Sequence, residues 1–305
     1  MGTVLLTRRI PSSVLTHLQS QHTVDLYTGE GAIPREELLR RIEGKDALIS
    51  MLTDRIDGEL AETGTPSLKI VATVAVGYDN IDVAAVRNRG IILTHTPDVL
   101  TEATAEFTWA LILGIARRVG EADRLIRAGG WKGWSLDFML GTELRGKQLG
   151  IIGAGRIGRA VAAKAPAFGM RAVFAKHDMS LDELLVTSDV VSIHSAATPD
   201  NRHLINRKTL IRMKRSAILV NTARGSLVDE EALVWALDER LLAGAALDVF
   251  EREPEVHEGL LKHENVLLVP HLGSATRETR TAMTELAVRN AIAVLAGEPP
   301  LTPVP

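Results

Sequence analysis

Three side chains suited to carbonyl chemistry each follow a short apolar run of the sequence. Arg224 comes after the run 217–221, Glu253 after 244–249, and His271 after 266–269. If these runs are parallel strands of one sheet, their carboxyl ends meet at the edge where open α/β sheets bind ligands. We therefore expect a cation, a carboxylate and an imidazole to converge on one cleft.

Hydride reduction of a small 2-oxo acid would use each of these groups. The guanidinium of Arg224 can hold a substrate carboxylate and polarise the carbonyl, and His271 can deliver a proton near neutral pH. Glu253 on the other ring nitrogen would favour the imidazolium and fix its orientation. Each residue has a structural alternative: Arg224 could cap local carbonyls, Glu253 could be an exposed turn acid, and His271 could be a satisfied core histidine. Glu251 and Glu255 also compete for the carboxylate role, and the scheme requires no metal.

A glycine-rich stretch follows another apolar run and precedes a helical pattern. The run 150–152 leads into Gly153-Ala154-Gly155-Arg156-Ile157-Gly158, and residues 159–168 read as a helix. Glycines at these spacings permit a tight turn, close approach of the backbone to a pyrophosphate, and contact between helix and sheet. We expect a dinucleotide site here, although a plain strand-to-helix turn is the alternative.

The residues after the next strand bear on the choice of cofactor. Dinucleotide sites that bind NAD usually carry an acidic residue about twenty positions after the glycine motif, where it accepts the ribose hydroxyls. Here the run 172–175 is followed by Lys176 and His177, with Asp178 just beyond. Lys176 and His177 could receive the 2′-phosphate of NADP, so NADP is favoured over NAD; a solvated strand end is the alternative.

Short apolar runs alternate with helical patterns along the whole chain, which predicts parallel sheets with crossover helices. We expect an α/β protein with two Rossmann-like, doubly wound parallel-sheet domains, the second of six strands. The helix over about 101–118 is apolar nearly all round, so we expect it to be covered on several sides, with another subunit as one candidate cover. The expected strands cover residues 4–7, 47–50, 70–74, 91–94, 149–152, 172–175, 190–194, 217–221, 244–249 and 266–269. The other expected helices cover residues 34–41, 83–89 and about 276–296.

Composition excludes several classes of function. The 305 residues carry a formal charge of -3 with scattered Lys and Arg, so no nucleic-acid or membrane partner is expected. There are no cysteines, which excludes disulfides, thiolate metal sites and cysteine nucleophiles. No signal peptide is visible, and the most apolar stretch, Phe107 to Ala116, is too short for a membrane span. We expect a cytoplasmic protein.

The chain resembles the D-isomer-specific 2-hydroxyacid dehydrogenases, particularly those that reduce glyoxylate and hydroxypyruvate. The resemblance implies that Arg224, Glu253 and His271 are the catalytic residues and that the amides of Val76 and Gly77 receive the substrate carboxylate. It also implies a discontinuous fold, with a substrate domain of residues 1–97 plus 277–305 and an NAD(P)-binding Rossmann domain of residues 98–276. The stretches that carry it are 76–82, 96–106, the glycine loop, 221–225, 247–250 and 270–275.

The same resemblance implies further binding residues and an oligomeric state. Trp134 resembles the tryptophan that reaches the active site of a neighbouring subunit, with an interface anchor as the alternative; either reading implies a homodimer. The resemblance also implies cofactor contacts from Thr104, Arg156, Ile157, Thr222, Asp248 and Gly273. We further expect the cofactor to contact the glycine loop (Gly153, Gly155 and Gly158) and Lys176, His177, Ala223 and His271.

Two departures from the family pattern affect the adenine side of the pocket. The chain lacks roughly fourteen residues between the strand at 172–175 and the segment 180–185, where relatives have another helix and strand. His194-Ser195-Ala196 also replaces the usual His-Cys-Pro. Two rivals remain open: a phosphite- or formate-type dehydrogenase of the same architecture, and a nucleotide-sensing corepressor or scaffold.

Overall fold

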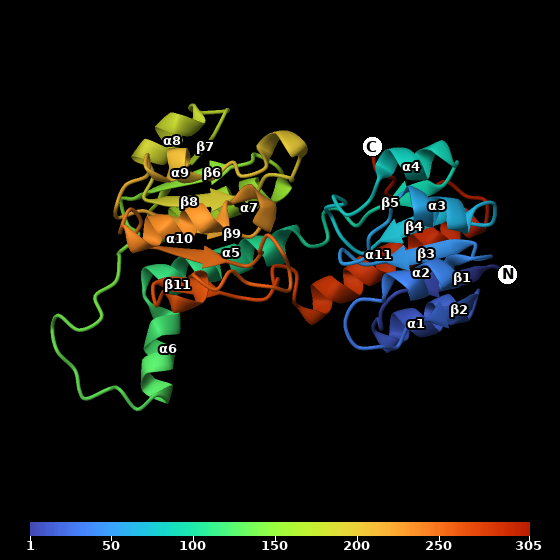
Figure 1. Ribbon diagram of the computed structural model, residues 1–305, viewed down its shortest axis with the longest axis horizontal. Helices are drawn as coiled ribbons and strands as arrows, with labels where there is room; N and C mark the ends of the chain where they lie inside the picture. Colours follow the sequence, from blue (N-terminus) through green and yellow to red (C-terminus); the bar gives the residue numbers. More distant parts are fainter. The chain divides into compact units, whose positions relative to one another are not determined.

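The computed structural model describes residues 1–305, and the chain divides into two compact units (Figure 1). The first unit combines residues 1–100 with residues 275–305, and the second comprises residues 101–274. The first unit is therefore discontinuous in sequence.

The first unit contains a five-stranded sheet in the order β2-β1-β3-β4-β5, and all of its strand pairs are parallel. The strands are β1 (Thr3–Leu6), β2 (Thr23–Leu26), β3 (Ala47–Ser50), β4 (Ile70–Thr73) and β5 (Ile92–Thr94). Strand β2 was not expected from the sequence, because it is a partly exposed edge strand that includes Asp25 and shows only a weak apolar signal.

Helices cover both faces of this sheet. One core packs α2, α3 and α4 against the face that carries Leu5, Leu48, Val71 and Leu93, while α1 and α11 pack together on the other face. The last helix of the chain is therefore part of the first unit. The helices are α1 (Ser12–Gln19), α2 (Arg35–Ile42), α3 (Gly58–Gly64), α4 (Val83–Asn88) and α11 (Arg277–Leu295).

The second unit contains a six-stranded parallel sheet in the order β11-β10-β9-β8-β6-β7, which confirms the expected six strands. The strands are β6 (Gln148–Ile152), β7 (Arg171–Phe174), β8 (Val190–Ile193), β9 (Ile218–Asn221), β10 (Gly244–Leu247) and β11 (Val266–Leu268). Every strand expected from the sequence is present within two residues at each end. β7 lies at the edge of the sheet, and the chain continues from it directly to α8.

The faces of the second sheet bury alternate residues of each strand in two separate cores. In β9, Ile218 and Val220 face α5 and α7, while Leu219 faces the helices on the opposite side. Strands buried on both faces read as continuous apolar runs, which explains the sequence pattern. The helices are α5 (Thr101–Ala116), α6 (Val119–Arg127), α7 (Arg156–Lys164), α8 (Leu181–Thr187), α9 (Arg207–Leu210) and α10 (Glu230–Asp238).

Polar side chains fix the beginnings of many helices. Asp57, Asp82, Ser180, Asp229 and Thr276 each accept a hydrogen bond from a backbone amide in the first turn of the helix that follows. Such caps satisfy amides that have no partner inside the helix. None of the helices combines the length and the apolar character needed to cross a membrane.

The segment between α6 and β6 has neither helix nor strand and extends away from the body of the second unit (Figure 1). Together with α6, this segment leaves after Arg118, whose φ is +54°, and the chain returns where the amide of Thr142 donates to the carbonyl of Ala116 at 2.7 Å. Between these points it exposes large apolar side chains: Trp131, Trp134, Leu136, Phe138 and Leu140. Residues 119–140 are called the arm below.

Candidate active site

The loop after β9 presents Arg224 and is organised by a buried asparagine. The side chain of Asn221 accepts a hydrogen bond from the amide of Ala223 at 3.0 Å and donates to the carbonyl of Arg224 at 2.8 Å. Arg224 Nη1 donates to the carbonyl of Ala223 at 2.8 Å, so the local capping considered from the sequence does occur. The guanidinium also acts electrostatically on Glu253, which places its charge beside the next loop.

Glu253 and His271 form a direct pair across two neighbouring strand ends. His271 Nδ1 lies 2.8 Å from Glu253 Oε2, and Glu253 Oε1 accepts the amide of Phe250 at 3.1 Å. Burial alone would raise the pKa of Glu253, but the hydrogen bond and charge of His271, the Phe250 amide and the Arg224 charge together lower it. Glu253 is therefore an ionised partner of His271.

The two competing glutamates are placed differently. The carboxylate of Glu251 faces His203 and Arg202, and Glu255 is exposed further along the same turn. The geometry thus selects Glu253 among the three acids of this loop.

Asp248 holds the turn that carries His271. Its carboxylate is 1% exposed and accepts the amides of Leu272 at 2.5 Å and Gly273 at 2.9 Å, while its carbonyl accepts the amide of His271 at 2.8 Å. Burial raises the pKa of Asp248, and the two amides and the His271 charge oppose that rise. His271 has φ +53°, a left-handed backbone that needs such support. The contacts of Asp248 here are those of a turn organiser.

Glycines let the loops at the strand ends pack closely against their neighbours. A Cβ on Gly225 would lie 1.9 Å from the carbonyl carbon of Phe250, so the Arg224 loop packs directly on the loop that carries Glu253. A Cβ on Gly273 would lie 3.2 Å from Asp248 Oδ2 and 3.4 Å from Thr104 Cγ2. The close approach at Gly225 therefore fixes how the loop of Arg224 lies against the loop of Glu253.

Buried threonines connect α5 to this edge of the sheet. Thr108 Oγ1 donates to the carbonyl of Thr104 at 2.8 Å and lies 3.0 Å from Thr222 Oγ1. All three side chains are at least nine-tenths buried. The structure thus brings Thr104, Thr222, Asp248 and Gly273, four of the cofactor residues expected from the sequence, to one end of the sheet.

The glycine motif has the local geometry of a phosphate-binding turn. Gly153 has φ +109°, and a Cβ there would lie 2.6 Å from the carbonyl of His194; a Cβ on Gly158 would lie 2.1 Å from the carbonyl oxygen of Gly153. A Cβ on Gly155, in contrast, would meet nothing within 4 Å. α7 begins at Arg156, inside the motif, and no side chain caps it. An uncapped helix N-terminus with open space at the second glycine fits the pyrophosphate of a dinucleotide.

The turn after β7 carries the residues that we expect to contact the ribose of the cofactor. Lys176, with φ +65°, and His177 are exposed, and the turn closes through the hydrogen bond from the amide of Lys176 to the carbonyl of Met179 at 2.8 Å. Asp178 Oδ2 accepts the amide of Phe174 at 2.7 Å. The carboxylate of Asp178 is therefore occupied within its own turn.

His194 follows β8 beside the glycine motif. Its Nε2 lies 2.8 Å from Ser192 Oγ, and burial lowers the pKa of His194 to about 3. The ring is neutral at physiological pH and supports the wall of this turn without carrying charge.

Val76 and Gly77 lie in the first unit, in the loop after β4. Asn80 holds this loop, since its Nδ2 donates to the carbonyls of Asp54 at 2.7 Å and Met51 at 3.3 Å. The indole of Trp134 is in the arm of the second unit and is 79% exposed.

Several residues that build the site had no role assigned to them individually from the sequence. Asn221 and Thr108 position other residues through buried hydrogen bonds, and Gly225 provides the closest backbone approach. A polar residue that ends an apolar strand, as Asn221 does, is a usable signal. No sequence motif marks His203, whose side chain contacts Glu251.

The comparisons with known proteins agree with this geometry. Residues 109–273 match the family model described as D-isomer specific 2-hydroxyacid dehydrogenase, NAD binding domain. A glyoxylate reductase from Thermofilum pendens is 48% identical over 97% of this chain and 92% of its own length.

Solved structures are also similar to this chain over nearly its whole length. The TT0316 protein from Thermus thermophilus superposes with a TM-score of 0.94 at 47% identity, covering 99% of this chain and 100% of that one. An NADPH-dependent glyoxylate/hydroxypyruvate reductase from Sinorhizobium meliloti gives a TM-score of 0.86 at 32% identity, covering 100% and 98%. This chain therefore belongs to the D-isomer specific 2-hydroxyacid dehydrogenases, enzymes that transfer hydride between NAD(P)H and 2-oxo acids.

Proposed function

We propose that the protein reduces glyoxylate or hydroxypyruvate to the corresponding 2-hydroxy acid, with Arg224, Glu253 and His271 as its catalytic residues. The observation that carries this proposal is the 2.8 Å contact between His271 Nδ1 and Glu253 Oε2, beside the charge of Arg224. Similarity to enzymes named glyoxylate reductase over nearly the full length supports the substrate class.

In this scheme the three side chains divide the work on the substrate. Arg224 binds the carboxylate and carbonyl oxygen of the 2-oxo acid and polarises the carbonyl. His271 donates its Nε2 proton to that oxygen as it gains negative charge. Glu253 accepts the Nδ1 proton in a hydrogen bond, which keeps the ring oriented and favours its protonated form.

We assign the substrate carboxylate to the amides of Val76 and Gly77. The support is the resemblance to the family together with the fixed position of their loop, which Asn80 ties to the loop after β3. Rigid amides of this kind bind carboxylates without a cost in reorganisation.

The cofactor, when bound, supplies the hydride. Gly153, Gly155 and Gly158 with the first turn of α7 would hold its pyrophosphate, and Thr104, Thr222, Ala223, Asp248 and Gly273 lie at the same end of the sheet. The relative from Sinorhizobium meliloti has been crystallised with NADP and malonate. We propose that this chain also prefers NADPH.

The preference is assigned to Lys176, with His177 as a second donor. Both are exposed after β7, whereas the carboxylate of Asp178 is bonded to the amide of Phe174. A charged hydrogen bond contributes roughly 1.5–3 kcal/mol, which is about ten- to a hundred-fold in affinity.

The test compares kcat/KM for NADPH and NADH in the parent, in Lys176→Asp and in the control Asp178→Asn. We expect the NADPH preference to fall at least about ten-fold in Lys176→Asp only. Equal use of both cofactors by the parent would refute the assignment.

We further propose a homodimer in which Trp134 contributes to the partner's substrate pocket. The support is the arm, which exposes Trp131, Trp134 and Leu136 to solvent in the single chain. Trp134→Ala should raise KM for the oxo acid while leaving the dissociation constant of NADPH unchanged. A monomer by sedimentation at assay concentration would contradict this.

The cytoplasm remains the compartment that we propose.

A substrate screen separates the proposed activity from its rivals. We expect NADPH oxidation with glyoxylate and hydroxypyruvate, reduced at least about a hundred-fold by His271→Ala. NADP reduction with phosphite or formate, and none of the proposed activity, would instead assign a different hydride donor. Tight cofactor binding without turnover of any 2-oxo acid would favour a sensor or scaffold.

A further inference from the structure

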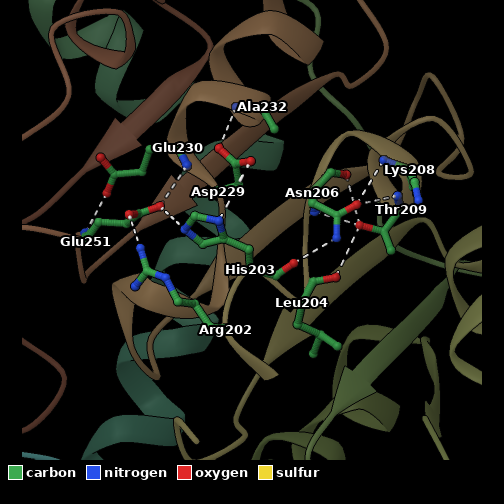
Figure 2. Close-up of polar contacts among 10 residues, drawn as sticks. All are labelled: Arg202, His203, Leu204, Asn206, Lys208, Thr209, Asp229, Glu230, Ala232 and Glu251. Atoms are coloured by element: carbon green, nitrogen blue, oxygen red, sulfur yellow. Dashed lines mark hydrogen bonds and ion pairs between the residues drawn. The ribbon is translucent and has the colours of Figure 1, made fainter. Parts of the chain in front are cut away.

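A cluster of charged side chains lies next to the reactive residues but outside them. Figure 2 shows the imidazole of His203 between the carboxylates of Asp229 and Glu251, with Arg202 reaching Glu251. His203 Nε2 lies 2.7 Å from Glu251 Oε1, and His203 Nδ1 lies 3.9 Å from Asp229 Oδ2. Arg202 Nη2 lies 3.3 Å from Glu251 Oε2. Both oxygens of Glu251 therefore face cationic or cation-forming groups.

His203 joins the two loops that carry Arg224 and Glu253. Its backbone amide donates to the carbonyl of Ser226 at 2.8 Å, two residues after Arg224. Its imidazole contacts Glu251, two residues before Glu253. One residue thus holds the Arg224 loop through its backbone and the Glu253 loop through its side chain.

The other contacts of Glu251 strengthen this connection. The amide of Glu251 donates to Glu230 Oε1 at 2.8 Å, and the amide of Glu230 lies 3.4 Å from Glu251 Oε1. Glu230 is 7% exposed, and it begins α10 directly after the helix cap Asp229. The Glu253 loop is therefore anchored to the start of a helix as well as to His203.

The backbone of His203 is itself constrained. Its φ of +51° lies in the left-handed region, where a residue other than glycine persists only if its surroundings hold it. The contacts with Ser226 and Glu251 provide that hold. A strained residue that bridges two reactive loops is better suited to positioning than to filling space.

We propose that His203, through Glu251, is a positioning residue that sets the spacing between Arg224 and the Glu253–His271 pair. The inference rests on the proposed roles of those three residues. Because Glu253 bonds to His271 through a single carboxylate oxygen, a small shift of the 248–253 loop would weaken that contact. Misplacement by about 1 Å can reduce a rate by about a hundred-fold.

The carboxylates of the cluster have partners without an added ion. Glu251 contacts Arg202 and His203, and Asp229 Oδ1 accepts the amide of Ala232 at 3.0 Å. A divalent metal at the same three ligands is the alternative outcome of the test.

The experiment compares His203→Asn and Glu251→Gln with the control His263→Asn. The control removes another imidazole–carboxylate pair of the second unit, His263 Nε2 with Asp238 Oδ1 at 3.4 Å, which does not touch the reactive loops. We expect both test variants to lower kcat/KM for glyoxylate about ten-fold or more, with an unchanged dissociation constant for NADPH. The double variant should be no worse than the single ones.

A measurement that does not depend on turnover completes the test. The ¹⁵N signals of the His271 imidazole report its contact with Glu253 through the pH midpoint of their titration. They are assigned in ¹⁵N-labelled protein by their absence in His271→Asn. We expect this midpoint to move to lower pH in His203→Asn and in Glu251→Gln, but not in His263→Asn. An unmoved midpoint overturns the inference even if the parent is active, whereas an inactive parent with a moved midpoint overturns only the proposed function. Stabilisation of the parent, but not of His203→Asn, by one equivalent of Zn²⁺ would assign the cluster to a metal and overturn the inference.

Discussion

Replacing Glu253 with Gln removes the negative charge beside His271 and keeps the length of the side chain. The carboxylate contacts His271 Nδ1 at 2.8 Å, and the lowered pKa of Glu253 means that it stays ionised throughout the working pH range. The proposed proton donor of the pair is His271. The variant therefore isolates the effect of the carboxylate on proton delivery.

The magnitude follows from the strength of a charged hydrogen bond. Such a bond contributes about 1.5–3 kcal/mol, and about 1.4 kcal/mol corresponds to one pH unit. The side chains of His271 and Glu253 remain 28% and 30% exposed, so solvent screens part of the interaction. We expect Glu253→Gln to shift the pH profile of kcat/KM by about one unit.

The sign follows from the direction of the reaction. In the proposed mechanism, reduction takes a proton from His271, so kcat/KM should fall as rising pH removes that proton. With Gln at position 253 the proton is lost at lower pH, and the basic limb of the profile should move down by about one unit. Below that limb the variant should keep most of its activity.

The assay is kcat/KM for glyoxylate with saturating NADPH across the pH range, for the parent, Glu253→Gln and the control Glu255→Gln. Glu255 is exposed in the same turn, so it tests whether any nearby charge has the same effect. A basic limb that stays in place in Glu253→Gln, or that moves equally in the control, would refute the coupling of Glu253 to His271.

Three further substitutions test the framework of the site. Gly155→Val should raise the dissociation constant of NADPH about ten-fold or more without lowering Tm, because a Cβ there meets nothing within 4 Å in the protein and lies at the start of α7, where we propose that the pyrophosphate binds; unchanged binding by fluorescence titration would contradict this. Gly225→Ala should lower the free energy of unfolding by about 1–3 kcal/mol in urea, because its Cβ would lie 1.9 Å from the Phe250 carbonyl carbon; full stability would show that the loops can separate. His194→Asn should lose less stability than the parent on acidification. In the parent, the pKa of His194 is about 3 in the folded state against 6.5 in the unfolded state, so the unfolded state gains a proton first as pH falls below 6.5. This lowers the free energy of unfolding progressively, by up to about 5 kcal/mol near pH 3. Parallel stability curves for that variant and the parent would contradict this last expectation.

The positions of the strands and of the candidate catalytic residues at their ends could be predicted from the sequence because both depend on local patterns. A strand buried on both faces produces an apolar run, and the residue after it must lie at the edge of the sheet. The choice among Glu251, Glu253 and Glu255 could not be predicted, because it depends on how one loop folds back on the amides of Phe250 and Glu251.

Non-local contacts explain what the sequence did not predict. β2 was missed because an edge strand does not need a continuous apolar pattern, and Asp25 interrupts it. Gly225 lies outside the glycine motif, and its close contact with Phe250 becomes visible only when two distant loops are placed side by side. His203 is a single histidine in a loop, and its partners Ser226 and Glu251 come from separate parts of the chain.

Two carboxylates flank His271, and the protein shifts their pKa values in opposite directions. Asp248 is almost fully buried, so its pKa is raised, and its oxygens hold the amides of Leu272 and Gly273. Glu253 is partly exposed and lies beside His271 and Arg224, so its pKa is lowered. Groups whose environments separate their pKa values in this way take different roles. Asp248 fixes the position of the ring, and the ionised Glu253 places a negative charge beside its Nδ1, so one acid supports the turn and the other supplies the charge.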